Sequence, residues 1–465
     1  MNSFLSRFSQ ISKIKQKRIY LDYASITPID DRVIKHISKI SKEYPANPNS
    51  LYKEGVLAFK ELERSREKVA KHLDVHADEI VFTSGGTESN NLAIQGVLKA
   101  YKMSQVTKRA GEDVSEVAGA GGTDDAKVNP QKPHIISSEI EHPAVRELLL
   151  QYQESGECEV TFIPVGVDGI VDLKEFKKAL RPETILVTIM YVNNEIGTIQ
   201  PIAEISKIVR HYKKTKLEKV IEENKKPMTY SSIYPLVHTD ACQAVLFCPM
   251  RAINLGVDMI TLDSAKFYGP RGVGALYIKR SITQSKAIVP IQIGGSQEFE
   301  LRAGTQNVAG ISGFAYAMDL AISEKEKESA RLSALRDFVV EELNKAVLDE
   351  KISNIIFNGT YGKDEYGNAL RVPNNINICV PDMDAEYTVL RLDVRGVCVS
   401  SVTSCRSKNE DSTSYVVEAL NKNVNGETEA TFDCGKSSLR ITFGRFTTDR
   451  EVKKLVKVLI DVLRK

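Results

Sequence analysis

The sequence predicts an α/β fold, with a mainly parallel sheet that is covered by helices on both faces and followed by a smaller α/β unit. Between about residues 75 and 280, seven β-branched or apolar runs alternate with amphipathic segments, which is typical of a doubly covered sheet. Later, a long helical stretch (308–349) precedes shorter strand-like runs and a final amphipathic helix (449–464). The seven runs lie at 79–85, 134–140, 159–165, 185–192, 235–245, 259–265 and 273–278.

The composition is that of an ordinary globular chain with no strong electrostatic field. Of 465 residues, 42% are hydrophobic, enough to bury a large core. Lys plus Arg (63) nearly balances Asp plus Glu (61), so no global charge points to nucleic acid or a membrane surface. No apolar run approaches the roughly 20 residues that span a bilayer. A small-molecule substrate is therefore expected.

The termini, insertions and cysteines set expectations about compartment. Residues 1–20 are basic, as in an organelle presequence or a plain N-terminal helix, and we favour the helix. Residues 102–131, 214–233 and 421–436 look inserted, and the first is expected to be a disordered loop. Seven scattered cysteines without a CxxC pattern predict free thiols, a reducing compartment and no metal site. We expect a cytoplasmic protein, with the mitochondrion as the lesser alternative.

Polar residues that end the apolar runs mark the expected ligand-binding edge, because ligands of such sheets bind beyond the carboxyl ends of the strands. One candidate is "TSGGTESNN" (83–91), where two glycines and Thr87 leave N–H groups free for a phosphate, although a capped tight turn has the same letters. The others are Thr83, Ser84, Glu139, Asn193, Asn194, Asp240, Ser264 and Lys266.

Three further segments offer chemistry, each with a plainer alternative. In "HTDACQA" (238–244), Asp240 can hold a protonated ring nitrogen or cap a helix. Lys266 ends the run before "FYGPRG" and can form a Schiff base, although a surface lysine is the ordinary interpretation. His142 of "EHPAV" can stack on a planar ring or serve as a cap. Cys405 lies in the polar stretch "VSSVTSCRSKNED", either as an incidental surface thiol or as a mobile nucleophile.

Taken together in this order and spacing, these segments resemble the pyridoxal-phosphate enzymes of the class V aminotransferase group, specifically cysteine desulfurases of the NifS/IscS kind. The resemblance extends over nearly the whole chain. It implies fold type I with a seven-stranded sheet. The matching stretches are "LDYASITPID", "PANPNS", "FTSGGTESNN", "EHPAV", "NNEIGTIQPI", "HTDACQA", "KFYGPRGVGALY", "RAGTQNVAG" and "SLRITFGRFTT".

The resemblance implies a cofactor site for pyridoxal phosphate. Lys266 would hold the cofactor as an internal aldimine and move the proton at Cα, and Asp240 would pair with the pyridine nitrogen. The remaining cofactor contacts that it implies come from Gly86 and Thr87 at the phosphate, Thr305 reaching it from the partner subunit, His142 stacking on the ring, and Gln243 and Asn194 at the phenolic oxygen or the substrate.

It also implies the substrate contacts and the nucleophile. Arg440 would clamp the carboxylate of L-cysteine with its planar fork, and Asn47 would line the same pocket. The stretch "SSVTSC" (400–405) aligns with the loop that carries the nucleophile, so Cys405 would attack the substrate sulfur and carry it away as a persulfide. Alanine would be the other product.

The chain departs from the family pattern at two places. Where relatives have a serine and a histidine that help to bind phosphate, it has Asp263-Ser264-Ala265 before Lys266. A carboxylate facing a phosphate dianion would repel it, so Asp263 is expected to point away or pair with a cation, with Ser264 taking over the contact. The nucleophile loop has Val402 and Thr403 in place of Gly-Ser, which is expected to stiffen it.

The leading hypothesis is a homodimeric cysteine desulfurase that supplies persulfide sulfur to an acceptor protein for iron–sulfur clusters or tRNA thiolation. A selenocysteine lyase and a non-catalytic sulfur-transfer scaffold remain as alternatives. The expected organisation is a large cofactor-binding domain at 24–285 and a small domain from 1–23 and 286–465, which carries a mobile cysteine loop at 400–412.

Overall fold

The computed structural model describes residues 18–112, 132–222, 233–381, 383–401, 413–421 and 434–464. Cys405, Val402 and Thr403 lie outside these ranges, as does most of the 400–412 loop. So do the greater parts of the insertions predicted at 102–131 and 421–436.

A seven-stranded sheet forms the larger part of the molecule, with the strand order β2-β8-β7-β6-β5-β3-β4. Neighbouring strands are parallel except where β8 pairs with β2 and β7, which confirms the mainly parallel sheet. The strands are β2 Ile80–Thr83, β3 His134–Ser138, β4 Glu159–Ile163, β5 Thr184–Thr188, β6 Leu236–Asp240, β7 Met259–Asp263 and β8 Gly274–Ile278.

Helices cover both faces of this sheet. Most of its strands are therefore buried along their whole length. On one face, Val81 and Ile135 pack with residues of α4 and α5. On the other, Phe82 and Ile136 pack with α3, α6, α7 and α10. The helices of this part are α2 Asp31–Glu43, α3 Lys53–Leu73, α4 Gly86–Glu112, α5 Pro143–Glu154, α6 Leu173–Ala179, α7 Ile202–Glu222, α8 Ala252–Leu255 and α9 Arg280–Gln284, with short 3₁₀ turns η2 Ala77–Glu79, η3 Ser264–Lys266 and η4 Glu298–Glu300.

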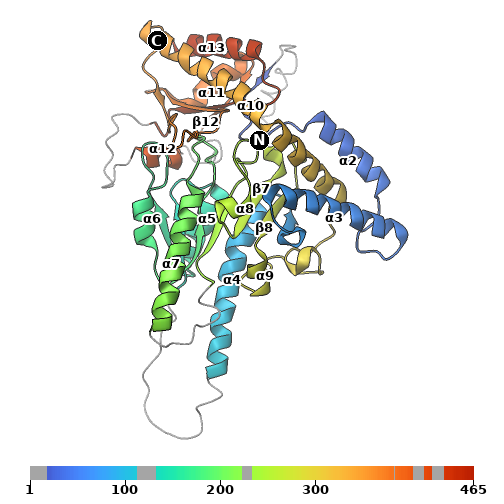
Figure 1. The fold of residues 1–465 in the computed structure, drawn as a ribbon. Helices are drawn as coiled ribbons and strands as arrows, with labels where there is room; N and C mark the ends of the chain where they lie inside the picture. The colour runs from blue at the N-terminus through green and yellow to red at the C-terminus, as the bar shows by residue number, and fades with distance from the viewer. Residues whose placement is uncertain are drawn as a thin grey trace, which may run out of the picture.

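A second, antiparallel sheet of order β12-β13-β10-β9 lies at one end of the molecule with α11 and α13 (Figure 1). A separate apolar core fills this region. Its elements are β9 Ile356–Phe357, β10 Asn375–Cys379, β12 Ser400–Ser401, β13 Ser438–Thr442, α11 Ala385–Val394 and α13 Asp449–Leu463, together with the parallel pair β1 Ile19–Tyr20 and β11 Val397–Cys398. Helix α12, Tyr415–Leu420, instead packs Val416, Ala419 and Leu420 against the core of the large sheet.

Helix α10, Val308–Leu348, links the two cores. Ile311 and Phe314 near its start pack into the core of the large sheet, whereas Leu332 and Val339 pack into the core of the second sheet. The helix confirms the predicted stretch 308–349 and fixes the second sheet against the first. Residues on the two sheets can therefore meet in one site.

Local structure differs from the sequence prediction at two segment ends. Ile19–Tyr20 form a strand beside β11 rather than the end of an N-terminal helix, because Ile19 and Leu21 fill the second core. Helix α4 continues to Glu112, eleven residues into the predicted loop, with Lys102 Nζ donating to Glu157 Oε2 at 2.7 Å. Only the part beyond that helix still lacks a described structure.

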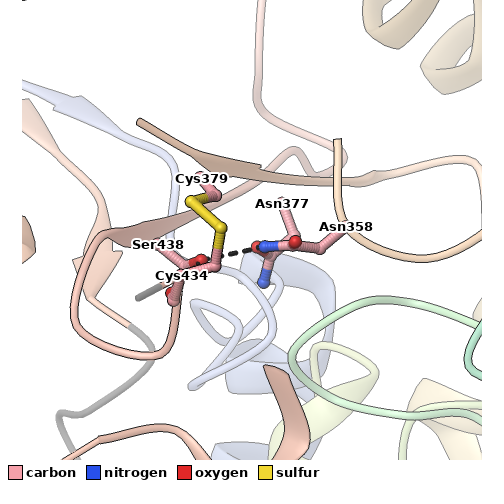
Figure 2. Close-up of a disulfide and its surroundings, with 5 residues drawn as sticks. All are labelled: Asn358, Asn377, Cys379, Cys434 and Ser438. Carbon is pink, nitrogen blue, oxygen red and sulfur yellow. Dashed lines mark hydrogen bonds between the residues drawn. A yellow bond between two sulfur atoms is a disulfide. The ribbon is translucent and has the colours of Figure 1, made fainter. Parts of the chain in front are cut away.

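The prediction that all cysteines are free thiols is wrong for one pair, because Cys379 and Cys434 form a disulfide (Figure 2). Cys379 ends β10 and Cys434 lies just before β13, its antiparallel neighbour, so a separation of 55 residues in sequence becomes a direct contact. Both are buried against Val417 of α12. Cys434 is therefore part of a small core.

Candidate active site

The candidate site lies where the carboxyl ends of β6 and β7 meet the start of α4. Asp240 is the last residue of β6, Asp263 is the last residue of β7, and Lys266 follows within η3. Strand β2 is parallel to β7, since both pair antiparallel with β8, so Gly86 at the start of α4 emerges at the same edge. This is the edge at which parallel sheets bind their ligands.

Asp240 is a buried carboxylate held by two donors. Its Oδ2 accepts a hydrogen bond from Asn90 Nδ2 at 2.7 Å, and its Oδ1 accepts one from the backbone N–H of Cys242 at 3.0 Å. Cys242 is packed beside it, and burial raises the pKa of its thiol well above the ordinary value, with the charges of Asp240 and Asp263 adding to the effect. Cys242 is therefore a neutral neighbour and not a nucleophile. Asn90, on α4, was not singled out from the sequence.

Lys266 points toward the segment that follows β1. Its Nζ donates to the carbonyl of Ser25 at 2.6 Å and to that of Ala24 at 3.2 Å. Gln243 Nε2 donates to the same Ala24 carbonyl at 2.8 Å. Lys266 and Gln243 thus meet at the Ala24 carbonyl, a backbone atom that sequence reasoning did not identify.

His142 is the N-cap of α5, and its Nδ1 accepts the backbone N–H of Ala144 at 3.1 Å. Because Nδ1 is an acceptor, the neutral ring carries its proton on Nε2. Burial lowers the pKa of His142, and the charged groups of Asp240, Lys266, Asp263 and Arg440 all act on the ring. The capping role foreseen for this residue is present, and the ring also lies among the charged groups of the site.

Arg440, on β13, brings the second sheet to the site. Its guanidinium donates to Asp22 Oδ1 at 2.8 Å, to Ser25 Oγ at 2.5 Å and to the carbonyl of Asn194 at 3.0 Å. Its buried Nε has no hydrogen-bond partner among the described residues. Asn194 thus meets Arg440 through its backbone. Ser25 contacts both Arg440 and Lys266, so the two side chains meet at one short segment.

At the start of α4, the side chain that faces the glycine turn is Asp263. Its Oδ2 accepts the N–H of Gly86 at 3.3 Å, and its Oδ1 accepts that of Ala265 at 2.9 Å. The buried hydroxyl of Ser264 points elsewhere, since a Cβ on Gly269 would lie 2.0 Å from it, and it has no partner in the described part of the chain. The structure therefore does not bring Ser264 Oγ to the turn, and Asp263 does not point away.

Two predicted residues, Asn47 and Thr305, lie apart from this cluster. Asn47 is exposed in the loop between α2 and α3, where its Oδ1 accepts the N–H of Asn49 at 2.9 Å. Thr305 is exposed in the loop before α10, and its predicted role concerns a partner subunit. Thr87 is at the glycine turn but exposed to solvent. Cys405 lies outside the described residues.

Sequence reasoning missed the segment Asp22–Ser25, whose side chains and carbonyls contact Arg440, Lys266 and Gln243. Its signal was present in the stretch "LDYASITPID", where an aspartate and two hydroxyl residues follow an apolar start. Within the described ranges, no group of three or more His, Cys, Asp or Glu side chains is placed to hold a metal. No described helix is both long and apolar enough to cross a bilayer.

The sequence profile of the family "Aminotransferase class-V" matches residues 19–111, 106–217 and 232–455. The chain belongs to this family. Over 97% of its length it is 38% identical to the cysteine desulfurase IscS of Dictyoglomus turgidum, of which the match covers 95%. It is 33% identical to the human selenocysteine lyase, with 96% of this chain and 91% of the lyase covered.

Solved structures of the family place the fold in the same group. A NifS-like protein superposes with a TM-score of 0.74 at 29% identity, covering 96% of this chain and 99% of the other. A structure titled "SspA in complex with cysteine" matches with a TM-score of 0.63 at 26% identity, covering 92% of this chain and all of the other. The chain thus has a class V aminotransferase fold of the NifS/IscS type.

Proposed function

We propose that the chain is a pyridoxal-phosphate-dependent cysteine desulfurase, which converts L-cysteine to L-alanine and leaves the sulfur as a persulfide on Cys405. The observation that carries the proposal is the meeting of Lys266 and Arg440 at Ser25, next to a buried Asp240. An amine and a carboxylate at the edge of the large sheet, together with a guanidinium from the second sheet, match what an amino-acid substrate and a pyridine aldehyde require.

The part of the site that would receive the pyridine ring, here called the ring end, consists of Asp240, Lys266 and His142, and these residues fit the cofactor. Asp240 is an ionisable acceptor at the end of a strand, suited to a protonated ring nitrogen, and its orientation is held by Asn90 and Cys242 N–H. The amine of Lys266 is held by the backbone carbonyls of Ala24 and Ser25 and forms no ion pair among the described residues. His142, whose Nδ1 is committed to the helix, offers a flat neutral ring. When bound, the cofactor would supply an electron sink for charge that develops at the substrate Cα.

The chain's own residues then have defined tasks. The Arg440 guanidinium, which has a buried unpaired Nε, would hold the substrate carboxylate in exchange for its bond to Asp22. Lys266 Nζ would take the Cα proton and return a proton to carbon. The Cys405 thiolate would form an S–S bond to the substrate sulfur while the C–S bond breaks, and the carbon would gain a proton to give alanine.

The family relationship and the surface support a homodimer. Helices α2 and α3 project to one side of the molecule (Figure 1), and large apolar side chains are exposed on them and on the loop between them, including Phe59 of α3 and Leu51 (97% exposed) and Tyr52 of the loop. Contiguous exposed apolar groups are typical of interaction surfaces. In the proposed dimer, this surface would be covered, and Thr305 would reach the partner's cofactor phosphate. The persulfide would pass to an acceptor protein for iron–sulfur clusters or tRNA thiolation.

Selenocysteine lyase is the second candidate, favoured by the 33% identity to the human enzyme of that name. The deciding experiment incubates purified, cofactor-supplemented protein with L-cysteine or L-selenocysteine and measures alanine, sulfide and selenide. A desulfurase gives alanine and sulfide with a reductant present, adds one sulfur to the Cys405 peptide, and loses this activity in Cys405→Ala. Retained selenide release in that variant, with no cysteine turnover in the wild type, would favour the lyase.

A non-catalytic scaffold is the remaining alternative. It predicts that neither amino acid is consumed and that Lys266→Ala binds pyridoxal phosphate as well as the wild type does. Absence of visible cofactor absorption in the supplemented wild-type protein would support it.

A further inference from the structure

Three N–H groups of the glycine turn before α4 already donate to oxygens of the chain itself. The N–H of Ser84 donates to Glu88 Oε2 at 2.8 Å, that of Gly85 to Thr83 Oγ1 at 3.4 Å, and that of Gly86 to Asp263 Oδ2 at 3.3 Å. Free N–H groups at a helix start are what make such a turn bind an anion. Here two of the three acceptors are carboxylates.

Strand register explains how Asp263 reaches the turn. Across β2, β8 and β7, Thr83 is paired with Gly274, and Gly274 is paired with Asp263. A Cβ on Gly274 would lie 2.6 Å from Gly85 Cα, so only glycine at this position lets the turn sit directly against β8. With no side chain between them, the carboxylate of Asp263 extends over β8 to Gly86.

The carboxylate is also held in place. Its second oxygen caps η3 through the N–H of Ala265 at 2.9 Å, so its position does not depend on the weaker bond to Gly86. Among the described residues it forms no ion pair that would neutralise it. A Cβ on Gly86 would meet Cys242 Sγ at 2.7 Å and Asp263 Oδ2 at 3.4 Å, which shows how closely these two side chains line the turn. An ionised carboxylate has no proton to donate to a phosphate.

We propose that Asp263 acts as a resident anion at the start of α4, so that the chain gains little affinity from a cofactor phosphate and discriminates weakly between pyridoxal phosphate and pyridoxal. The proposal rests on the proposed cofactor use. A phosphate must displace the carboxylate from Gly86 or bind beside it, and either route costs affinity by lost hydrogen bonds or charge repulsion. Pyridoxal, which lacks the phosphate, avoids this cost.

The test measures binding of both vitamers, by equilibrium dialysis and visible absorption, to the full-length wild type, Asp263→Ser and Asp263→Asn. Both variants keep an oxygen that can cap η3 but remove the charge. We expect each to bind pyridoxal phosphate at least about tenfold more tightly than the wild type, with pyridoxal affinity changed by less than about threefold. Asp78→Asn, which removes one exposed carboxylate at η2, should change neither affinity.

A second measurement uses inorganic phosphate, which forms no covalent bond to Lys266. Inorganic phosphate should compete with pyridoxal phosphate more strongly in Asp263→Ser than in the wild type. Equal affinity for pyridoxal phosphate in wild type and both Asp263 variants, with unchanged phosphate competition, overturns the inference but leaves the proposed function intact. Failure of every variant and the wild type to bind either vitamer, with Lys266→Ala indistinguishable from them, overturns both.

Discussion

Two aspartates, Asp240 and Asp263, end adjacent strands of the large sheet with the same local geometry and opposite consequences. Each caps the backbone two residues later, Asp240 at Cys242 and Asp263 at Ala265. The second oxygen of Asp240 meets the side-chain amide of Asn90, whereas that of Asp263 meets the helix N–H of Gly86. A carboxylate at position 240 attracts a protonated ring, whereas a carboxylate at position 263 competes with a phosphate.

An aspartate at a strand end can therefore assist or oppose ligand binding. Which of the two it does depends on the charge of the ligand group that binds beside it. The first aspartate, Asp240, is buried and held by a neutral amide, so its negative charge is left for a cation to match. The second occupies donors that an anion would use. The ring end of the site is thus complementary to its proposed ligand, and the phosphate end is not.

The largest effect is expected at Lys266, whose amine acts at the ring end of the site and not at the phosphate end. Lys266→Ala should lower alanine formation by on the order of 10³-fold or more, because both the cofactor attachment and the Cα proton transfer are lost. Initial rates with saturating L-cysteine measure it. Lys177→Ala, which removes an exposed lysine on α6, is the control and should retain full activity. A Lys266→Ala rate within tenfold of the wild type contradicts the site.

Asp240→Asn tests the contrast between the two aspartates directly. At saturating cofactor, turnover should fall by on the order of 10²-fold, because a neutral amide no longer stabilises a protonated ring. Asp263→Asn, the matched change one strand away, should not reduce it. Steady-state kinetics of the two variants under one set of conditions give the comparison. Similar losses in both would mean that the two carboxylates are equivalent, contrary to their different surroundings.

Arg440→Lys sharpens the comparison from the side of the substrate. An ammonium cannot reproduce the fork that reaches Asp22, Ser25 and the Asn194 carbonyl, so the KM for L-cysteine should rise about 10- to 100-fold, with a smaller change in kcat. The affinity for the cofactor should stay within a few-fold of the wild-type value. This result would distinguish the substrate contact of Arg440 from the cofactor contacts at Asp240 and Asp263. Arg395→Lys, on an exposed arginine after α11, is the control and should leave KM unchanged.

The smallest effect is expected at Asn90, which supports Asp240 without touching the substrate. Asn90→Ala removes the 2.7 Å bond to Oδ2 and should weaken binding of pyridoxal and pyridoxal phosphate alike, by about tenfold. Dialysis with both vitamers measures the change. An effect confined to the phosphorylated vitamer would place Asn90 at the phosphate end and remove the distinction drawn here.

By itself, the sequence determined the alternation of strands and helices, because burial on both faces of a parallel sheet demands near-continuous apolar runs such as those of β3 and β5. It also marked Asp240 and Lys266 as candidates, since the first ends such a run and the second follows one. Helix α10 followed from its length and composition. These features depend on local pattern, which a single chain displays directly.

Only the tertiary structure decided what these residues meet. Asn90 and the 22–25 segment reach the site through folding over separations of 150 and 241 residues, which no spacing rule contains. The Cys379–Cys434 bond depends on the pairing of β10 with β13. That Asp263 faces the turn depends on its pairing with Gly274 at the end of β7, whereas Ser264 already lies in η3 beyond the strand.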